Sequence, residues 1–351
     1  MDAGSLPANV KRASALRRVP PLEAIRFRPA RAEEGDVCAF ELPRDASTIT
    51  VESPAGRMMA IAPGDAFLAT TGWLQTRRMA VGGIPAGGLV PGGDYWVLSY
   101  SGVVGELISC HTPSQWGHLG RVRYLGAVYG DSGETLNIRQ FGVTGSDGVT
   151  DRQAPVHLIL GTSSEVGKTT AGVAVLRALR LQGHKTVVAL KATGLALVGE
   201  IAQYQDFGAS QAFDCIDFGL PTTFPQGRRG IDGFLGKVLD FCFSLPADAL
   251  VVECAGDPVS ANAPELLSCL KARRSELTIT LAAADALGAM GAKHALAEIG
   301  LKISLITGPC TDTAVLRERT EALCGIPAVN LANSPGDGPL SQLSSTAAAS
   351  R

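Results

Sequence analysis

The sequence predicts an α/β protein of two domains, in which a smaller β-rich domain precedes a domain built on a mainly parallel sheet. Three observations predict this arrangement. Short β-rich runs separated by turn residues fill the first half, continuous apolar runs alternate with helical segments in the second, and a glycine-bearing loop joins strand to helix where the second half begins. With 351 residues, of which 46% are hydrophobic, the chain is long enough to form two cores.

Both ends of the chain carry few of the bulky apolar residues that a core needs. Residues 1–35 are rich in Pro, Ala and Arg without a clear period, and residues 333–351 are rich in Ser, Ala, Gly and Pro. We therefore expect a flexible leader at 1–35 and a flexible tail at 333–351.

Residues 36–148 are expected to form the β-rich domain. Glycine and proline turns separate runs that are typical of strands, at 48–52, 65–71, 95–100, 121–129 and 136–141. Strands at this spacing favour a barrel or a sandwich. Its aromatic and basic side chains are interpreted as core and rim, with a pocket for a small acidic ligand as the alternative: Trp73, Arg77, Arg78, Tyr95, Trp96, Trp116 and His118.

Residues 154–332 are expected to form the α/β domain, after a polar, glycine-bearing connection. Buried strands are predicted at 156–161, 186–190, 249–253, 277–283, 303–307 and 328–331, and helices at 168–182, 286–298 and 313–323. Apolar strands that alternate with helices indicate a parallel sheet covered on both faces. Ligands bind such sheets at the carboxyl ends of the strands.

The loop between the first strand and the first helix of this domain is typical of a phosphate-binding loop. Its backbone amides and the helix N-terminus can bind phosphate oxygens, Lys168 can reach the terminal phosphates, and Thr169 can ligate magnesium. A strict pattern has glycine where this chain has Thr162, and an ordinary glycine-bearing helix start is the alternative. The predicted binding residues are Gly161, Thr162, Ser163, Ser164, Glu165, Val166, Gly167, Lys168, Thr169 and Thr170.

Charged residues after two other strands complete the predicted site. Glu253 ends an apolar strand and is predicted to hold magnesium, with Asp257 in reserve. Lys191 ends another and is predicted to orient the acceptor or to neutralise a developing phosphate charge. Asp206 is a further candidate for magnesium or a substrate amine. A solvated carboxylate and a surface lysine are the alternatives for Glu253 and Lys191.

The predicted cofactors are ATP and Mg²⁺. The chain lacks a guanine-reading Asn-Lys-x-Asp after the strand at 303–307, which favours adenine. Asn330, beyond the last predicted strand, is a candidate to hydrogen-bond the base, and a backbone cap is its alternative role.

Bulk properties argue against several other classes. Lys and Arg number 31 against 33 Asp and Glu, so we expect a small-molecule substrate and no nucleic acid partner. The sequence has no run of 18 apolar residues, so we expect no membrane partner. Its eight cysteines form no Cys-x-x-Cys pair and most lie in apolar stretches, so we expect reduced thiols and a cytoplasmic location. The histidines lack metal-ligand spacing, and no Gly-x-Ser-x-Gly elbow occurs.

Two families resemble this chain in the α/β domain. The loop at 161–170, Lys191 and the stretch Glu253-Cys-Ala-Gly are similar to dethiobiotin synthetase and the cobyrinic acid amide synthases, which carry Gly-Thr-x-x-x-Val-Gly-Lys-Thr in the loop. That resemblance implies ATP, magnesium and transfer of the γ-phosphate to a carboxylate or carbamate oxygen. Cys254 and Asp257 replace glycines of that family's pattern. Dimers are common among these relatives, so a homo-oligomer is expected.

The second resemblance is closer and covers residues 156–331. The stretches at 191–194, 217–223 and 284–288 are similar to a P-loop family that includes the D-glutamate N-acetyltransferases. This likeness implies an alternative in which the loop binds the pyrophosphate of coenzyme A.

The leading functional hypothesis is therefore an ATP-dependent kinase or ligase that activates a small carboxylate or amine. Its predicted catalytic residues are Lys168, Lys191 and Glu253, with Thr169, Glu253 and Asp206 as metal candidates. The alternatives are an acetyl-CoA-dependent N-acyltransferase acting on an amino acid, and a nucleotide-gated binding or metallochaperone module.

Overall fold

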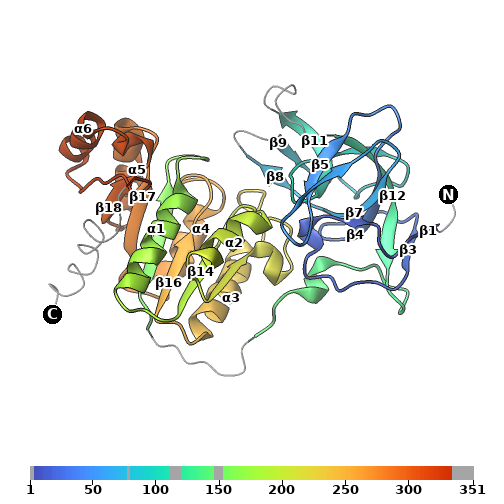
Figure 1. Ribbon diagram of the computed structural model, residues 1–351, viewed down its shortest axis with the longest axis horizontal. Coiled ribbons are helices and arrows are strands. Elements are labelled where there is room, and N and C mark those ends of the chain that lie inside the picture. Colours follow the sequence, from blue (N-terminus) through green and yellow to red (C-terminus); the bar gives the residue numbers. More distant parts are fainter. Residues whose placement is uncertain (1–3, 77–79, 111–119, 146–152, 334–351) are drawn as a thin grey trace. The chain divides into compact units, whose positions relative to one another are not determined.

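The computed structural model describes residues 4–76, 80–110, 120–145 and 153–333, and the chain divides into two compact units (Figure 1). The first unit comprises residues 1–144, 195–199 and 215–226, and the second comprises residues 145–194, 200–214 and 227–351. The predicted tail from residue 334, most of the predicted connection, and Arg77, Arg78, Trp116 and His118 lie outside the described residues.

The first unit contains a closed β-barrel. Strands β12, β4, β7 and β11 pair in that order, and β10 pairs with both β11 and β12, which closes the circuit. The prediction of a β-rich region before the α/β part is confirmed, and closure removes the free edges of these five strands. The strands are β1 (Gly4–Leu6), β2 (Lys11–Arg12), β3 (Ile25–Arg28), β4 (Val37–Glu41), β5 (Ile49–Glu52), β6 (Met58–Ile61), β7 (Ala66–Thr71), β8 (Leu74–Gln75), β9 (Ala80–Gly83), β10 (Asp94–Val97), β11 (Val103–Cys110) and β12 (Arg121–Tyr129).

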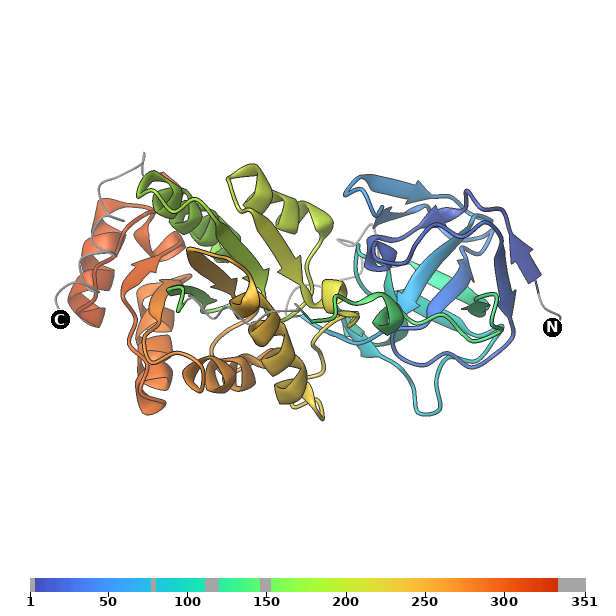
Figure 2. The same ribbon diagram turned by 90° about the horizontal axis from the view of Figure 1, so that it is seen from below.

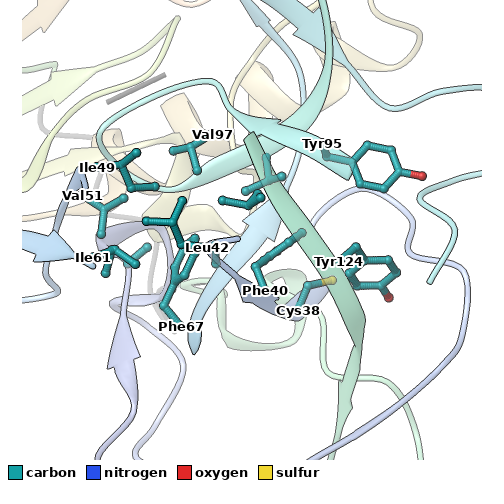
Figure 3. Close-up of a cluster of buried hydrophobic side chains, with 14 of the residues drawn as sticks. Cys38, Phe40, Leu42, Ile49, Val51, Ile61, Phe67, Tyr95, Val97 and Tyr124 are labelled. Atoms are coloured by element: carbon teal, nitrogen blue, oxygen red, sulfur yellow. The ribbon is translucent and has the colours of Figure 1, made fainter. Parts of the chain in front are cut away.

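Aromatic side chains from four barrel strands form the centre of its core. The ring of Phe40 lies 6.0 Å from that of Phe67 and 5.5 Å from that of Tyr124, and Tyr95 meets Tyr124 edge to face at 6.5 Å. Figure 3 shows these rings converging with Leu42 and other aliphatic side chains. The core interpretation of Tyr95 therefore fits its position, since it is 9% exposed.

The expectation of a flexible leader is wrong for residues 4–35. Strand β3 pairs with β12, and the side chains of Leu16 and Ile25 are buried. The Arg12 guanidinium donates to the carbonyl oxygens of Leu16 and Val19, and so satisfies buried main chain. Strands of two to four residues are too short to show a periodic pattern in the sequence.

The run at 136–141 was also misassigned, because it forms a 3₁₀ helix (Ile138–Phe141) instead of a strand. Asn137 accepts a hydrogen bond from the Arg139 N–H, and Gln140 accepts one from the Asn137 N–H. This reciprocal cap favours a helical turn over an extended strand.

Two later segments of the chain group with the barrel rather than with the parallel sheet. Arg17 makes a two-pronged ion pair with Asp217, at 3.2 and 2.8 Å, and Thr222 donates its hydroxyl hydrogen to the Trp73 carbonyl. The Glu52 carboxylate accepts the N–H groups of Val198 and Gly199, where a helix begins. These contacts explain why residues 195–199 and 215–226 belong to the first unit.

The second unit is an α/β domain with a six-stranded sheet in the order β15, β14, β16, β13, β17, β18. Every neighbouring pair is parallel, which confirms the predicted fold class. The predicted strand at 328–331 is absent, since Ala328 makes only an isolated bridge with Ile306. The strands are β13 (Val156–Gly161), β14 (Val187–Lys191), β15 (Gln211–Asp214), β16 (Ala249–Glu253), β17 (Thr278–Ala282) and β18 (Leu305–Thr307).

Helices cover both faces of this sheet, with α1 on one face and α3 and α4 on the other (Figure 2). Helix α1 contacts β13, β14, β16 and β17, and α5 packs against α6. The helices are α1 (Lys168–Leu181), α2 (Val198–Asp206), α3 (Ile231–Ser244), α4 (Ala263–Lys271), α5 (Ala286–Glu298) and α6 (Ala314–Cys324). In the part of the chain that the structure describes, no helix has the length and apolar character needed to cross a membrane.

The sheet has a topological switch point at β13. The chain leaves β13 for β14 on one side, whereas β17 and β18 lie on the other side of β13. In open α/β sheets, ligands bind outside the carboxyl ends of the strands at such a point. The predicted phosphate loop begins there.

Candidate functional site

The loop from Gly161 to Lys168 has the backbone of an anion-binding turn. Gly167 precedes α1 with φ 89° and Glu165 has φ 60°, so both lie in the left-handed region. Among the residues that the structure describes, no side chain caps the N-terminus of α1. The first N–H groups of the helix therefore remain available to phosphate oxygens, with the positive end of the helix dipole behind them.

Lys168 lies folded over this loop. Its Nζ donates to the Ser163 carbonyl oxygen at 2.6 Å, and the residue is 8% exposed. A Cβ at Gly161 would lie 2.8 Å from the Lys168 stem, so glycine at this position makes room for the lysine. Burial lowers the pKa of Lys168, against the attraction of Glu253, which raises it. Incoming phosphates would replace the carbonyl contact with a charged partner.

Thr162 occupies the place where a strict phosphate loop has glycine. Its N–H donates to Ala282 O at 2.9 Å, and its hydroxyl accepts the Ala284 N–H at 3.1 Å. The departure from the pattern therefore ties the loop to the end of β17 and leaves the turn at Gly167 intact.

Glu253 and Thr169 meet at the carboxyl edge, as their predicted shared role requires. The Thr169 hydroxyl donates to Glu253 Oε1 at 3.3 Å, and Glu253 is 1% exposed at the end of β16, directly beside β13. Tyr204 Oη donates to Glu253 Oε2 at 2.7 Å. A hydroxyl and a carboxylate at this position suit magnesium, whose remaining ligands would be phosphate oxygens and water.

Lys191 lies on the other side of Glu253. Its Nζ is 2.9 Å from Glu200 Oε2 and 3.8 Å from Glu253 Oε1, and its strand register aligns it with both Glu253 and Asp214. Burial by itself lowers the pKa of Lys191, but the carboxylates outweigh it and raise the pKa above its ordinary value. Lys191 is therefore a buried cation paired with carboxylates, and the alternative of a surface lysine is wrong.

The structure does not bring Asp206 and Asp257 to this cluster. Asp206 is the exposed last residue of α2, and among the described residues no hydrogen bond or ion pair joins it to Thr169 or Glu253. The Asp257 carboxylate accepts the Val259 N–H at 3.0 Å within its own turn. Nor do the described residues contain a cluster of three or more His, Cys, Asp or Glu that would hold a metal alone.

Cys254, which departs from the synthetase pattern, is buried and lies in a hydrogen-bonded environment. Its thiol is 3.3 Å from the Thr193 hydroxyl, and Thr193 in turn accepts the Ala255 N–H at 2.9 Å. Burial raises the pKa of Cys254 to about 12, so the thiol stays protonated at neutral pH and is no nucleophile.

A cavity of about 220 Å³ adjoins the phosphate loop and the first turn of α1. It is smaller than the roughly 300–1,000 Å³ typical of sites for whole drug-sized ligands, and suits a single ring system. Gly308 forms part of its wall in a glycine-only conformation, φ 94°, where a Cβ would lie 2.7 Å from the Val166 carbonyl oxygen. Its lining residues are Glu165, Val166, Gly167, Thr170, Ala171, Thr307, Gly308, Pro309, Asp312, Asn330, Leu331 and Ala332.

Asn330 lies in the wall of this cavity, with its amide engaged in the protein. Its Nδ2 donates to Asp312 Oδ1 at 3.1 Å, and its Oδ1 accepts the N–H groups of Ala332 and Asn333, both at 3.0 Å. Asn330 therefore shapes the cavity and orients Asp312, which also lines it.

A larger opening, of about 580 Å³, lies at the amino ends of the strands, between residues such as Gln153, His184 and Asp248. It lacks the loop, the helix N-terminus and the buried charges of the carboxyl edge. Despite its size, we place the site at the carboxyl edge, because phosphate binding needs those groups.

Sequence reasoning missed the residues of α2 that support the site. Glu200 and Tyr204 are four residues apart on one helical face, and they bind Lys191 and Glu253 respectively. That spacing was the available signal, but the segment at 198–206 has too few apolar residues to be recognised as a helix. Gly172 of α1, which lies against Tyr204, was missed as well, because nothing in the sequence marks that contact.

Comparisons with known proteins leave the family of this chain open. No family model and no curated protein matches the chain. Similar solved structures include the 54 kDa signal recognition particle protein from Aeropyrum pernix in complex with GDP, at 18% identity and TM-score 0.34, where the match covers 56% of this chain and 48% of that one. A ParA family ATPase from Chlorobium tepidum is 12% identical over 50% of this chain and 82% of that chain, at TM-score 0.34. A DUF1611 family protein from Anabaena variabilis is 13% identical over 60% and 64%, at TM-score 0.40.

The class of protein therefore rests on the chain's own geometry. A parallel sheet, a strand-loop-helix turn with an uncapped helix N-terminus, a lysine folded over that turn and a carboxylate on the adjacent strand define a P-loop α/β domain.

Proposed function

We propose that this protein binds ATP with magnesium at the phosphate loop and activates a small carboxylate or amine by phosphoryl transfer, as a kinase or ligase. The observation that carries the proposal is the meeting of Thr169 with Glu253, 3.3 Å apart, beside the buried Lys168 and Lys191. This arrangement supplies a metal position and two cations next to an anion-binding turn.

Each residue has a chemical task in the proposed reaction. Lys168 and the loop amides would stabilise charge on the transferring phosphoryl group, and Thr169 and Glu253 would hold magnesium, which neutralises phosphate charge when bound. Lys191 would face the acceptor side, where its raised pKa keeps it cationic. The cavity of about 220 Å³ beside α1 would receive the base.

The proposal has two further features. We propose a cytoplasmic location because all eight cysteines are free thiols. We also propose a homo-oligomer, which rests on the resemblance to dimeric relatives alone.

The first test is calorimetric titration of the protein with ATP plus magnesium and, separately, with GTP plus magnesium and with acetyl-CoA. Lys168→Ala should weaken ATP binding by about 10- to 100-fold, because a hydrogen bond to a charged group contributes about 1.5–3 kcal/mol. The matched control is Lys237→Ala, on the exposed side of α3, which should bind as the wild type does.

The three ligands separate the hypotheses. Tight ATP binding that is lost in Lys168→Ala supports the proposal, and transfer of labelled γ-phosphate to a small acceptor would complete it. Heat with acetyl-CoA and none with ATP contradicts it and favours the N-acyltransferase. Preference for GTP contradicts the choice of base only.

A further inference from the structure

Tyr204 is buried against the candidate metal ligand without belonging to the phosphate loop. It lies on α2 at 2% exposed, and its hydroxyl donates to Glu253 Oε2 at 2.7 Å. The hydroxyl therefore meets the Glu253 carboxylate from a buried position.

The two oxygens of the Glu253 carboxylate have different neighbours. Oε2 accepts from Tyr204, whereas Oε1 lies 3.3 Å from the Thr169 hydroxyl and 3.8 Å from Lys191 Nζ. The contact with Tyr204 thus turns Oε1 toward Thr169. Without it, the carboxylate would be free to rotate toward Lys191 and form a closer ion pair, which competes with a metal.

The helix opposite is shaped to receive this tyrosine. Gly172, in the second turn of α1, faces the Tyr204 ring, and a Cβ there would lie 2.1 Å from the hydroxyl oxygen. Glycine is unfavourable inside a helix by roughly 1 kcal/mol relative to alanine. A glycine at this position of α1 leaves the space that the Tyr204 hydroxyl occupies, which indicates a requirement for the tyrosine.

We infer that Tyr204 is a positioning residue that holds Glu253 in the orientation required for magnesium beside Thr169. The inference rests on the proposed function, because it concerns the same site. Groups that orient a metal ligand without touching the metal typically alter metal affinity by about 10- to 100-fold. The role should therefore show in the magnesium-dependent part of nucleotide binding.

The test compares the ATP dissociation constant in excess magnesium with that in EDTA, for the wild type and for Tyr204→Phe. The dissociation constant in magnesium should rise about tenfold in the variant while the EDTA value stays nearly unchanged, so the ratio of the EDTA constant to the magnesium constant should fall about tenfold. A merely structural role would weaken both values alike. Gly172→Ala should give the same loss, because its methyl group displaces the hydroxyl while alanine favours the helix.

Tyr124→Phe is the matched control. It removes the same hydroxyl from a buried tyrosine of the barrel, where the group donates to the Ala30 carbonyl at 2.8 Å, and it should leave the ratio unchanged. An unchanged ratio in Tyr204→Phe, or an equal loss with and without magnesium, overturns the inference while nucleotide binding itself stands. A wild type that shows no magnesium-dependent binding overturns the proposed function and the inference together.

Discussion

The barrel and the parallel-sheet unit both bury polar side chains, but these side chains have different partners in the two units. In the barrel, the Thr70 hydroxyl donates to the Asp36 carbonyl, and the carboxylates of Asp36 and Glu52 accept main-chain N–H groups. In the parallel-sheet unit, Lys191 and Glu253 contact one another through their charged ends. Buried carboxylates that accept backbone amides stabilise turns and helix ends, whereas opposed charges gathered at one sheet edge point to a ligand that needs them.

Truncation of the two cores should give the largest effects and tests whether the units are energetically separate. Phe40→Ala should lower the free energy of unfolding of the barrel by about 3–5 kcal/mol, and Leu158→Ala that of the parallel-sheet unit by about 2–5 kcal/mol. Trp73 and Trp96 belong to the first unit, and the sequence has no tryptophan from residue 145 onward, so tryptophan fluorescence does not report on the second unit. Nucleotide binding reports on the second unit.

The comparison predicts distinct outcomes for the two variants. Phe40→Ala should shift the fluorescence transition in denaturant and leave ATP binding intact, and Leu158→Ala should do the reverse. A fluorescence transition that moves equally in both variants would mean that the two units unfold as one, and the comparison would fail.

In each unit the sequence predicted some elements and missed others. The strand at 156–161 and the helix at 286–298 have the predicted bounds, because continuous apolar runs and a clear cap leave few alternatives. Helices α3 and α4 were missed although their buried residues repeat at helical spacing, and the four-residue strand β15 was missed because it carries too little pattern. In the barrel, the two-residue strands β2 and β8 carry too little pattern to be recognised, whereas the four-residue strands β5 and β10 overlap the predicted runs at 48–52 and 95–100.

The residues of the candidate site were predictable where they adjoin a recognisable strand or helix. Lys168, Thr169, Lys191 and Glu253 were identifiable because each sits at the end of a recognisable strand or the start of a helix, and the structure brings them together. Tyr204 was not, because its role depends on a contact across 49 residues of chain that no local pattern encodes.

His157 offers a test of intermediate size, as a buried titratable side chain of β13 away from the charged edge. It is 8% exposed, and burial lowers its pKa from 6.5 to about 4, with a smaller contribution from His184. Among the residues that the structure describes, its Nδ1 has no hydrogen-bond partner. The unfolded chain therefore binds a proton between these two pKa values while the folded chain does not.

The free energy of unfolding should accordingly decrease as the pH falls through that window. Between about pH 7.5 and about pH 5 the loss from His157 should be on the order of 2 kcal/mol, since each pKa unit corresponds to about 1.4 kcal/mol. The measurement is the urea midpoint of the helical circular dichroism signal across this range, for the wild type and His157→Leu. The variant should show a shallower pH dependence, and parallel curves would contradict the assignment.

The smallest predicted effect compares one helix cap in each unit. The Asp285 carboxylate accepts the Gly288 N–H at 2.8 Å and begins α5, so Asp285→Ala should cost about 1 kcal/mol of stability. The Asn137 amide caps its 3₁₀ helix and also donates to Glu34 O and Asp36 Oδ1. Asn137→Ala should therefore cost more, despite the shorter helix, because it also leaves a buried carboxylate with one donor fewer.

The two readouts keep these small changes apart. Asp285→Ala should shift the midpoint of the helical signal and leave tryptophan fluorescence in place, and Asn137→Ala should shift the fluorescence. If Asp285→Ala proved the more costly of the two, its side chain would be doing more than capping α5. Because the Ala284 N–H donates to the Thr162 hydroxyl directly before this cap, the phosphate loop is the place where that extra cost would arise.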